Sequence, residues 1–367
     1  MKAQGFILID VDVAALNNAG TISKAGVENT VETKKIVKNG QTYVYVSGQA
    51  WRYWWRDTLQ KNFNWKLSPV TKLEKQNVVY TEANPIAFDD DDVFGYMRAS
   101  KMPVIDEATG TPKMKSNGKP EEKDATVTRI SPLKNSALIS VGSVRVSKNF
   151  SSMARQNDVP VLYGKEEYSA VMKGMFSLDI DQVGTFSSYN KTGFKNLNEQ
   201  LKKIAIEKAG SIIVKDKYVK NKSGAPEELI RLSSDTRRKR ITETIKALKT
   251  ISGGAMQTSN LTDVTPKFIV LATTKSGNHP FSHIISNDPV NHELPILKIE
   301  DLKEVLKEFS SDFIGNIYIG KRGGFWNECD AELKSLNEHQ VSDRSQVIYS
   351  TVNETIDSYC QQLEGLI

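Results

Sequence analysis

Cysteine and histidine are scarce in this chain of 367 residues, which has two cysteines and four histidines. Cys329 and Cys360 are not in a CxxC arrangement. That excludes a disulfide scaffold and a zinc ribbon, and indicates a reducing, cytoplasmic compartment. No segment approaches the roughly 18 apolar residues of a membrane-spanning helix. Asp10 and Asp12 come too early for the apolar region of a signal peptide, so we expect neither secretion nor membrane association.

The motifs of common catalytic and cofactor sites are also missing. No GxGxxG follows a strand, and neither Walker A spacing nor a GxSxG elbow is present. His279 and His283 have HxxxH spacing, but Pro280 between them prevents the regular helix that would bring both imidazoles to one zinc ion. The run Asp89–Asp92 is the obvious metal-binding candidate, yet we favour a solvated loop or an acidic cap before Phe94. We expect no catalytic residue, no metal and no cofactor.

Charge is nearly balanced overall but unevenly distributed. The chain has 49 Lys and Arg against 44 Asp and Glu, a formal charge of +5. Residues 201–250 hold 14 basic and 6 acidic side chains, a local +8, and residues 300–367 hold 6 and 13, a local −7. A basic centre can face a polyanion, and a chain with both regions can also face its own copies. A solvated surface without a partner is the alternative.

Hydrophobic periodicity predicts a mixed chain of strands and helices. Residues 6–13 and 41–47 alternate as strands, and at residue 48 the period changes to that of a helix. Ser47 is the candidate N-cap of this helix, and Trp51, Trp55 and Leu59 form its apolar stripe. Periodicity fades from 66 to 124, and we expect 101–124 to be a mobile excursion.

The second half of the chain also has the periodicities of strands and helices. Strands are expected near 176–186, 266–274 and 313–325, and helices near 237–252 and 300–309. In the first of these helices Ile241, Ile245 and Leu248 mark the buried face, and Gly253 with Gly254 supplies the stop. The order of elements predicts an α+β fold with an interrupted ferredoxin-like, or RRM-like, sheet.

Several basic and polar side chains are spaced as a nucleic-acid ligand requires. Gln49, Arg52 and Arg56 fall three and four residues apart, so they share one face of a helix whose start exposes backbone N–H groups. This arrangement suits a phosphodiester, although ordinary surface arginines are the alternative. The run 237–240 (RRKR) opens a helix, where cations oppose the macrodipole, which favours either an external anion or a tolerated exposed cluster. Further candidates on strands, helices and glycine-rich turns are Arg129, Lys134, Arg145, Lys148, Arg237, Arg238, Lys239, Arg240, Gly253, Gly254, Gln257, Lys275 and Asn278.

Seven segments carry a family resemblance. They are LIDVDVAALNNAG, YVSGQAWRYWWRDTL, FDDDDVFGYM, RISPLKNSALIS, FSLDIDQVGTF, RKRITETIKALKTISGGAMQTSNLTDVTPKFIVLA and GNHPF, in this order. Together they resemble the DevR or autoregulator family, the backbone subunits of type I CRISPR Cascade complexes, and are most similar to subtype I-B. The resemblance runs from about residue 6 to 326.

The resemblance implies an RRM-like palm with a fingers insertion and a thumb. Carried onto this chain, the palm is 1–65, 141–186 and 236–367 with an acidic tail, the fingers are 66–140, and the thumb is the basic excursion 187–235. It also implies copies stacked head to tail along the spacer of a CRISPR RNA, beside other Cascade subunits. The thumb of one copy is expected to interrupt the guide at intervals, and target DNA pairs with the exposed guide bases.

The resemblance and the residues indicate the same surface. Asn17 and Asn18 after the first strand, Ser47 with Gln49, Arg52 and Arg56 at the first helix, and Gly253, Gly254 and Gln257 would hold guide phosphates and sugars, and Lys275 and Asn278 could join them. The resemblance favours a non-catalytic role. Two alternatives stay open, namely a metal-dependent endoribonuclease using Asp89–Asp92, or Asp179 and Asp181, and a DNA-binding autoregulator.

Overall fold

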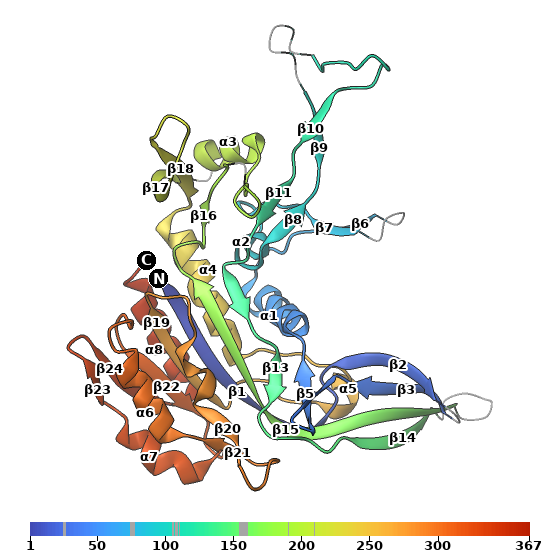
Figure 1. Ribbon diagram of the computed structural model, residues 1–367, viewed down its shortest axis with the longest axis vertical. Helices are drawn as coiled ribbons and strands as arrows, with labels where there is room; N and C mark the ends of the chain where they lie inside the picture. The colour runs from blue at the N-terminus through green and yellow to red at the C-terminus, as the bar shows by residue number, and fades with distance from the viewer. Residues whose placement is uncertain are drawn as a thin grey trace. The chain divides into compact units, whose positions relative to one another are not determined.

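The computed structural model describes residues 1–24, 27–73, 78–104, 106, 109, 111–153, 161–189, 191–208 and 210–367 (Figure 1). The chain forms two compact units. Unit 1 contains residues 1–63, 134–178 and 242–366, and unit 2 contains residues 64–133 and 179–241. The fold is mixed α/β, with one large mixed sheet and several helices.

Unit 1 is built on the large sheet. Its main path runs β23-β24-β22-β19-β1-β15-β13-β5-β4, while β2, β3, β12 and β14 pair beside this path. The strands are β1 (Lys2–Ala14), β2 (Asn18–Lys24), β3 (Val27–Thr33), β4 (Lys35–Lys38), β5 (Gln41–Val46), β12 (Leu133–Asn135), β13 (Leu138–Ser140), β14 (Ser147–Met153), β15 (Val161–Asp179), β19 (Phe268–Thr274), β22 (Ile317–Lys321), β23 (Gln340–Ser342) and β24 (Ser345–Ser350), with the separate pair β20 (Ile285–Asn287) and β21 (Pro295–Leu297).

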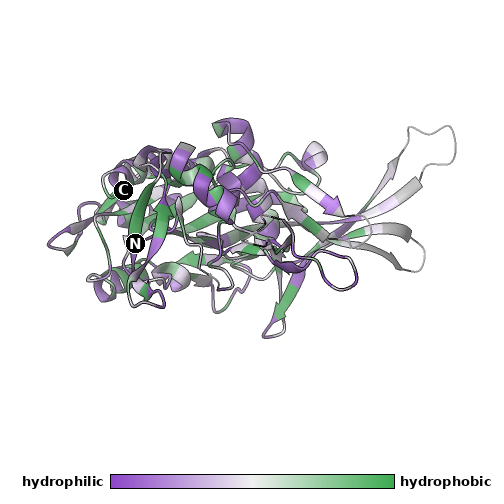
Figure 2. Ribbon diagram, turned by 90° about the horizontal axis from the view of Figure 1, so that it is seen from above, coloured by the Kyte–Doolittle hydropathy of each residue, from purple (hydrophilic) through white to green (hydrophobic). Residues whose placement is uncertain are grey.

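The first strand lies in the middle of this sheet and is buried on both faces. Phe6 and Leu8 join one apolar core, and Ile7 and Ile9 on the opposite face are 1% and 0% exposed. β1 pairs antiparallel with β19, from Lys2 opposite Thr274 onwards. Figure 2 shows hydrophobic residues concentrated on strands and hydrophilic residues on the helices and loops around them. The predicted two-faced strand is confirmed.

Helix α1 (Gly48–Phe63) packs on the sheet through its tryptophans. Trp51, Trp55 and Leu59 are at most 1% exposed, as the apolar stripe predicted. Trp55 stacks on Trp51 at 5.3 Å and meets the ring of Phe176 edge-on at 5.2 Å. Its indole N–H donates to the Thr244 carbonyl at 2.7 Å. The other helices of unit 1 are η1 (Ala247–Lys249), α5 (Gln257–Asn260), η2 (Pro280–His283), α6 (Ile299–Glu308), η3 (Asn327–Cys329), α7 (Asp330–Ser335) and α8 (Val352–Glu364).

Strands β2, β3, β14 and the first half of β15 extend together from unit 1 (Figure 1). The Glu166 side chain, 1% exposed, holds them at their base. It accepts hydrogen bonds from the Thr33 amide at 2.9 Å and hydroxyl at 3.0 Å, and from the Lys35 ammonium at 2.7 Å. A buried carboxylate needs such partners, and these contacts join the end of β3 and the start of β4 to β15 at the base of the projection.

Unit 2 combines short strand pairs with helices. Its elements are β6 (Val70–Leu73), β7 (Val78–Thr81), α2 (Asp89–Phe94), β8 (Tyr96–Arg98), β9 (Lys101–Pro103), β10 (Glu122–Asp124), β11 (Val127–Arg129), β16 (Thr185–Phe186), α3 (Glu199–Lys208), β17 (Ile212–Lys220), β18 (Pro226–Arg231) and the first part of α4 (Ser234–Lys246). Residues 101–103 and 122–124, expected in a mobile excursion, form the antiparallel pair β9–β10.

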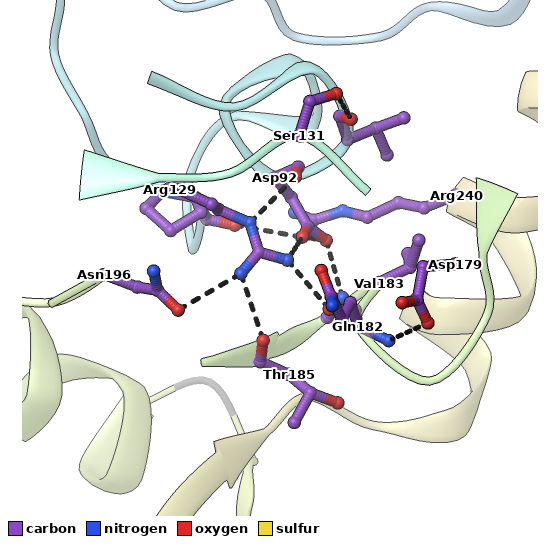
Figure 3. Close-up of polar contacts among 12 residues, drawn as sticks. Asp92, Arg129, Ser131, Asp179, Gln182, Val183, Thr185, Asn196 and Arg240 are labelled. Carbon is purple, nitrogen blue, oxygen red and sulfur yellow. Dashed lines mark hydrogen bonds and ion pairs between the residues drawn. The ribbon is translucent and has the colours of Figure 1, made fainter. Parts of the chain in front are cut away.

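A buried ion-pair network around Asp92 holds unit 2 together (Figure 3). The Asp92 carboxylate, 0% exposed, accepts from the guanidinium groups of Arg129 and Arg240, the latter at 2.7 Å. Arg240 also reaches Asp89 at 2.7 Å, and the Gly184 amide donates to Asp92 at 2.8 Å. Since both charges of each pair are desolvated, the network depends on every partner being present.

Arg129 connects this network to the segment from Gln182 to Phe186 (Figure 3). It donates to the carbonyls of Gln182 at 2.8 Å and Thr185 at 3.0 Å. Its guanidinium lies 4.5 Å from the centroid of the Phe186 ring. The Asn196 side chain joins through its oxygen at 3.4 Å. The network therefore ties residues 89–129 to residues 180–240.

Two expectations are corrected here. Of the two alternatives for Asp89–Asp92, the solvated loop is wrong and the acidic helix start before Phe94 is confirmed, because the run forms the first turn of α2 and Asp90, Asp91 and Asp92 are at most 5% exposed. Residues 187–235, expected as the thumb, lie in the same compact unit as 64–133. Gly253 and Gly254 do not stop α4, which ends at Lys246 and is followed by η1.

The network predicts a large effect of removing one charge. In Asp92→Asn, Arg129 and Arg240 stay buried without their shared counter-charge. We expect the free energy of unfolding to fall by about 3–5 kcal/mol, measured by urea denaturation.

Asp235→Asn is the matched control, because it makes the same chemical change in an exposed pair with Arg238 at 3.4 Å. Such a surface pair contributes about 0–1 kcal/mol. Equal losses in the two variants would contradict the structural role of Asp92.

Candidate nucleic-acid interface

The start of α1 is fixed by hydrogen bonds at Ser47. The Ser47 hydroxyl accepts from the Ala50 amide at 3.3 Å, so the predicted N-cap is confirmed. The Ser47 amide donates to the side-chain oxygen of Asn17 at 2.8 Å. This bond joins the loop after β1 to the helix start. Asn18, the other predicted asparagine, is exposed and begins β2.

The loop at 253–255 packs close to the start of α1 because two of its residues are glycines. A Cβ added to Gly253 would lie 2.1 Å from the Trp54 ring, and Gly254 has φ +110° with Leu16 beside it. The Ala255 amide donates to the Leu16 carbonyl at 3.0 Å. Only glycine allows this approach and this φ. The structure thus brings together the loops at 16–18, 47–49 and 253–255.

Gln257 shapes this glycine loop from within. Its side-chain nitrogen donates to the Gly253 carbonyl, and its side-chain oxygen accepts from the Thr262 amide at 3.0 Å. The side-chain amide of Gln257 is therefore hydrogen-bonded within the protein and supports the glycine loop. Its role as an RNA ligand stays a prediction.

Arg52 is positioned by a residue that the sequence did not single out. Its guanidinium donates to the Asn135 side-chain oxygen at 3.0 Å. The Asn135 side-chain nitrogen donates in turn to the Gly48 carbonyl at 3.1 Å and the Ser136 carbonyl at 3.0 Å. Asn135 therefore clamps the first turn of α1 and orients Arg52 at the same time. Its long-range partners left no signal in the sequence.

The electrostatics of this helix face favour an anion. Burial, and then the positive charge of Arg56, lower the pKa of the Arg52 guanidinium to about 10. Both side chains are half-buried, Gln49 is exposed on the same face, and Lys134 is exposed next to Asn135. A phosphate bound there would relieve the repulsion between the two cations and would accept from the first-turn amides of α1.

Two predicted residues lie at the opposite end of β1. Lys275 follows β19, whose end pairs with the start of β1, and its ammonium donates to the Ser311 carbonyl at 2.5 Å. The Asn278 carbonyl accepts from the Gln4 side chain at 3.3 Å. The ten residues of strand between Gln4 and the end of β1 span about 33 Å. Lys275 and Asn278 therefore do not join the interface around Ser47.

Arg145 and Lys148 bind carboxylates elsewhere in unit 1. Arg145 pairs with Glu293 at 2.6 Å, and Lys148 lies 3.6 Å from Glu166 and 3.7 Å from Glu32. These distances place both cations in ion pairs. Neither is brought to the start of α1 by a contact that the structure describes.

The basic residues expected near 129 and 237–240 belong to unit 2. Arg129, Arg237 and Arg240 are 6%, 5% and 2% exposed, so their predicted role in an exposed phosphate-binding surface is corrected. Arg237 donates to the carbonyls of Ile180 and Val183, both at 2.9 Å. The remaining pair, Arg238 and Lys239, lies nearer the surface.

The helix containing these arginines also begins earlier than expected. α4 starts at Ser234, and the Ser233 hydroxyl accepts from the Thr236 amide at 3.3 Å. The RRKR run is thus in the second turn rather than the first. The argument from an opposed macrodipole does not apply to it.

Among the described residues, no group of three or more His, Cys, Asp or Glu side chains could hold a metal ion. No helix in the described part of the chain is long and apolar enough to cross a membrane.

Comparison with solved structures finds chains with a similar fold. A chain from a structure titled "CRISPR RNA-guided surveillance complex" matches 99% of this chain and 100% of its own length, with a TM-score of 0.50 and 9% identity. A second, titled "CRISPR RNA-guided surveillance complex, pre-nicking", has the same coverage and TM-score and 10% identity. These similarities show a shared fold. No curated protein matches.

The family is established by sequence. The family model described as "CRISPR-associated negative auto-regulator DevR/Csa2" matches residues 7–293, which is more than half of the chain. The matched region includes β1, α1 and the loop at 253–255. The chain therefore belongs to the DevR/Csa2 family of CRISPR-associated proteins.

Proposed function

We propose that this protein is a guide-RNA-binding backbone subunit of a type I CRISPR Cascade complex, most similar to subtype I-B. Several copies bind head to tail along the spacer of a CRISPR RNA in the cytoplasm, together with other Cascade subunits. The observation that carries the proposal is the joining of Asn17, Ser47, Arg52, Asn135 and the 253–255 loop at the start of α1.

The chemistry of this interface suits a guide holder. Helix-start amides and guanidinium groups recognise phosphates, which are the same in every RNA sequence. Such a surface accepts any spacer and leaves the bases free to pair with target DNA.

We propose that unit 1 is an RRM-like palm. Support comes from the order β19-β1-β15-β13, with α1 between β1 and β13 and α4 between β15 and β19 in sequence. This is the βαββαβ order of elements in a ferredoxin-like sheet. Unit 2 then corresponds to the fingers, enlarged by residues 179–241.

For the thumb we propose the projection of β2, β3, β14 and β15. Its strand β2 begins at Asn18, directly after Asn17 of the interface, so an RNA bound at α1 would pass the base of the projection. The Glu166 contacts with Thr33 and Lys35 make this base rigid.

We propose that the protein does not cleave RNA. The Asp92 carboxylate is already neutralised by two arginines, and Asp89 is bound to Arg240. A metal-dependent nuclease needs carboxylates that are available to a divalent ion. This supports a structural role for the Asp89–Asp92 run.

The double variant Arg52→Ala, Arg56→Ala tests the proposed interface. Each guanidinium that leaves a phosphate lowers the salt slope of binding to a single strand by about 0.7. We expect weaker binding by a similar factor for unrelated RNA sequences and a slope smaller by about 1.4, measured by fluorescence anisotropy over a range of salt concentrations.

Lys298→Ala with Lys303→Ala is the matched control, because it removes two charges from surface pairs with Asp301 and Glu300 on or beside α6. If the salt slope is unchanged in the arginine variant, or changes equally in the control, α1 is not part of the RNA interface. Strong preference for one DNA duplex would favour a DNA-binding regulator.

Asn135→Asp tests the positioning of Arg52. The new carboxylate would still accept from Arg52 but would compete with phosphate for its charge and could not donate to the Gly48 carbonyl. We expect RNA affinity to fall about tenfold, the equivalent of roughly 1.4 kcal/mol. Asn135→Ala, which adds no charge, should weaken binding less.

Asn353→Asp on α8 adds the same charge at an exposed position. If it weakens RNA binding as much as Asn135→Asp does, Asn135 has no local role. Anisotropy with one RNA under one salt condition compares the three variants directly.

A further inference from the structure

Much of the basic centre at 201–250 is engaged by contacts inside the protein. Arg237 and Arg240 are buried in unit 2. Lys249 pairs with Asp357 at 2.7 Å in unit 1. An exposed cluster of lysines remains at the tip of the β17–β18 hairpin, with Asp216 before it and Glu227 and Glu228 after it. Residues 217–225 (KYVKNKSGA) contain three lysines and no acidic residue.

This turn presents an aromatic ring among the lysines. Tyr218 is 92% exposed, the highest value among the large hydrophobic side chains that the structure describes. Lys217, Lys220 and Lys222 are also exposed. Within the described residues, none of the three lysines makes an ion pair. Lys215, further down the hairpin, is different because it lies opposite Glu228 on the neighbouring strand.

Hydrogen bonds make the turn rigid at both ends. The Asp216 carboxylate accepts from the amides of Tyr218 at 2.8 Å and Val219 at 3.1 Å, so this acid is committed to the backbone. The Asn221 side-chain oxygen accepts from the amides of Ser223 at 3.1 Å and Ala225 at 3.0 Å. These bonds fix the backbone that carries the Tyr218 ring, so a partner has to order the side chain but not the chain around it.

The combination fits one class of partner best. Lysines attract any polyanion, but a fully exposed tyrosine among them adds a platform on which an unpaired base can stack. A duplex buries its base faces, and an acidic protein surface would use the charges without needing the ring. A single strand of nucleic acid uses both.

We propose that the tip of the β17–β18 hairpin, through the Tyr218 ring and the ammonium groups of Lys217, Lys220 and Lys222, binds a single strand of nucleic acid in addition to the strand held at α1. The two surfaces belong to different units and share no residue. The inference goes beyond guide binding, and either can fail without the other.

The experiment uses the full chain saturated with unlabelled RNA. Fluorescent oligo(dT) is then added to this RNA-loaded protein, either as a single strand or annealed to oligo(dA). In a separate experiment, labelled RNA is added to protein that carries no RNA. We expect Tyr218→Ala to weaken oligo(dT) binding about tenfold and Tyr218→Phe to preserve it, because the ring stacks without its hydroxyl. Removing the three lysines should lower the salt slope by about 2.

A second hairpin tip supplies the matched control. Residues 111–120 are exposed throughout and carry Lys113, Lys115 and Lys119 without an acid or an aromatic residue. Replacing these three lysines with alanine removes the same charge from the same unit. We expect this control to leave oligo(dT) binding within about twofold of the unmodified chain.

Four results of the binding experiments would overturn the proposal. The first is oligo(dT) binding that is unchanged in Tyr218→Ala, and the second is an equal loss of oligo(dT) affinity in the 111–120 control. The third is binding of the annealed duplex as tight as that of the single strand. The fourth is a Tyr218→Ala variant that loses affinity for the labelled RNA and not for oligo(dT). A loss confined to self-association, measured by sedimentation, would assign the tip to a second copy of the chain and would equally overturn it. Circular dichroism and urea denaturation establish that each variant is folded.

Discussion

The hydrogen bond from the Ser47 amide to the Asn17 side chain is the constraint on which the candidate interface depends. It joins the end of the central strand to the start of α1. The 253–255 loop then lies against Leu16 and Trp54, where glycines leave room for it. With these loops fixed, Asn17 and Asn135 hold the start of α1, and Asn135 also orients the guanidinium of Arg52. The sheet beneath supplies a rigid support, because β1 is buried on both faces.

Some charged side chains of this protein form buried ion pairs, and others are exposed at the surface. Asp92, Arg129 and Arg240 neutralise one another in the interior of unit 2. Within the basic centre at 201–250, Arg237 and Arg240 are buried and stabilise the fold, while the lysines at the tip of the β17–β18 hairpin remain exposed. Part of the acidic tail is likewise paired inside unit 1, since Asp357 meets Lys249.

Periodicity was sufficient to predict the elements that carry the interface. The alternation in β1, the tryptophan stripe of α1 and the cap at Ser47 are local patterns, and the structure confirms each of them. The Asp89–Asp92 run could not be interpreted in the same way. Its partners Arg129 and Arg240 lie 37 and 148 residues away, and no local pattern encodes such a pair.

The same limit explains what the sequence could not show about the candidate site. Lys275 and Asn278 resembled ligands by composition, but their distance from Ser47 follows from strand pairing. Asn135 was missed because its role depends on Arg52, 83 residues earlier. The bonds from Gln257 to the glycine loop could not be predicted, because they join residues that only the fold brings together.

Hydrogen exchange of the backbone amides tests the central claim most directly. The protein would be compared alone and with two RNAs of equal length and unrelated sequence. The account predicts slower exchange in the first turn of α1 and in the 253–255 loop, to the same extent with both RNAs, because phosphates bind there and bases do not. Exchange at the start of α1 that is unchanged by RNA, or slowed by only one of the two sequences, would contradict it.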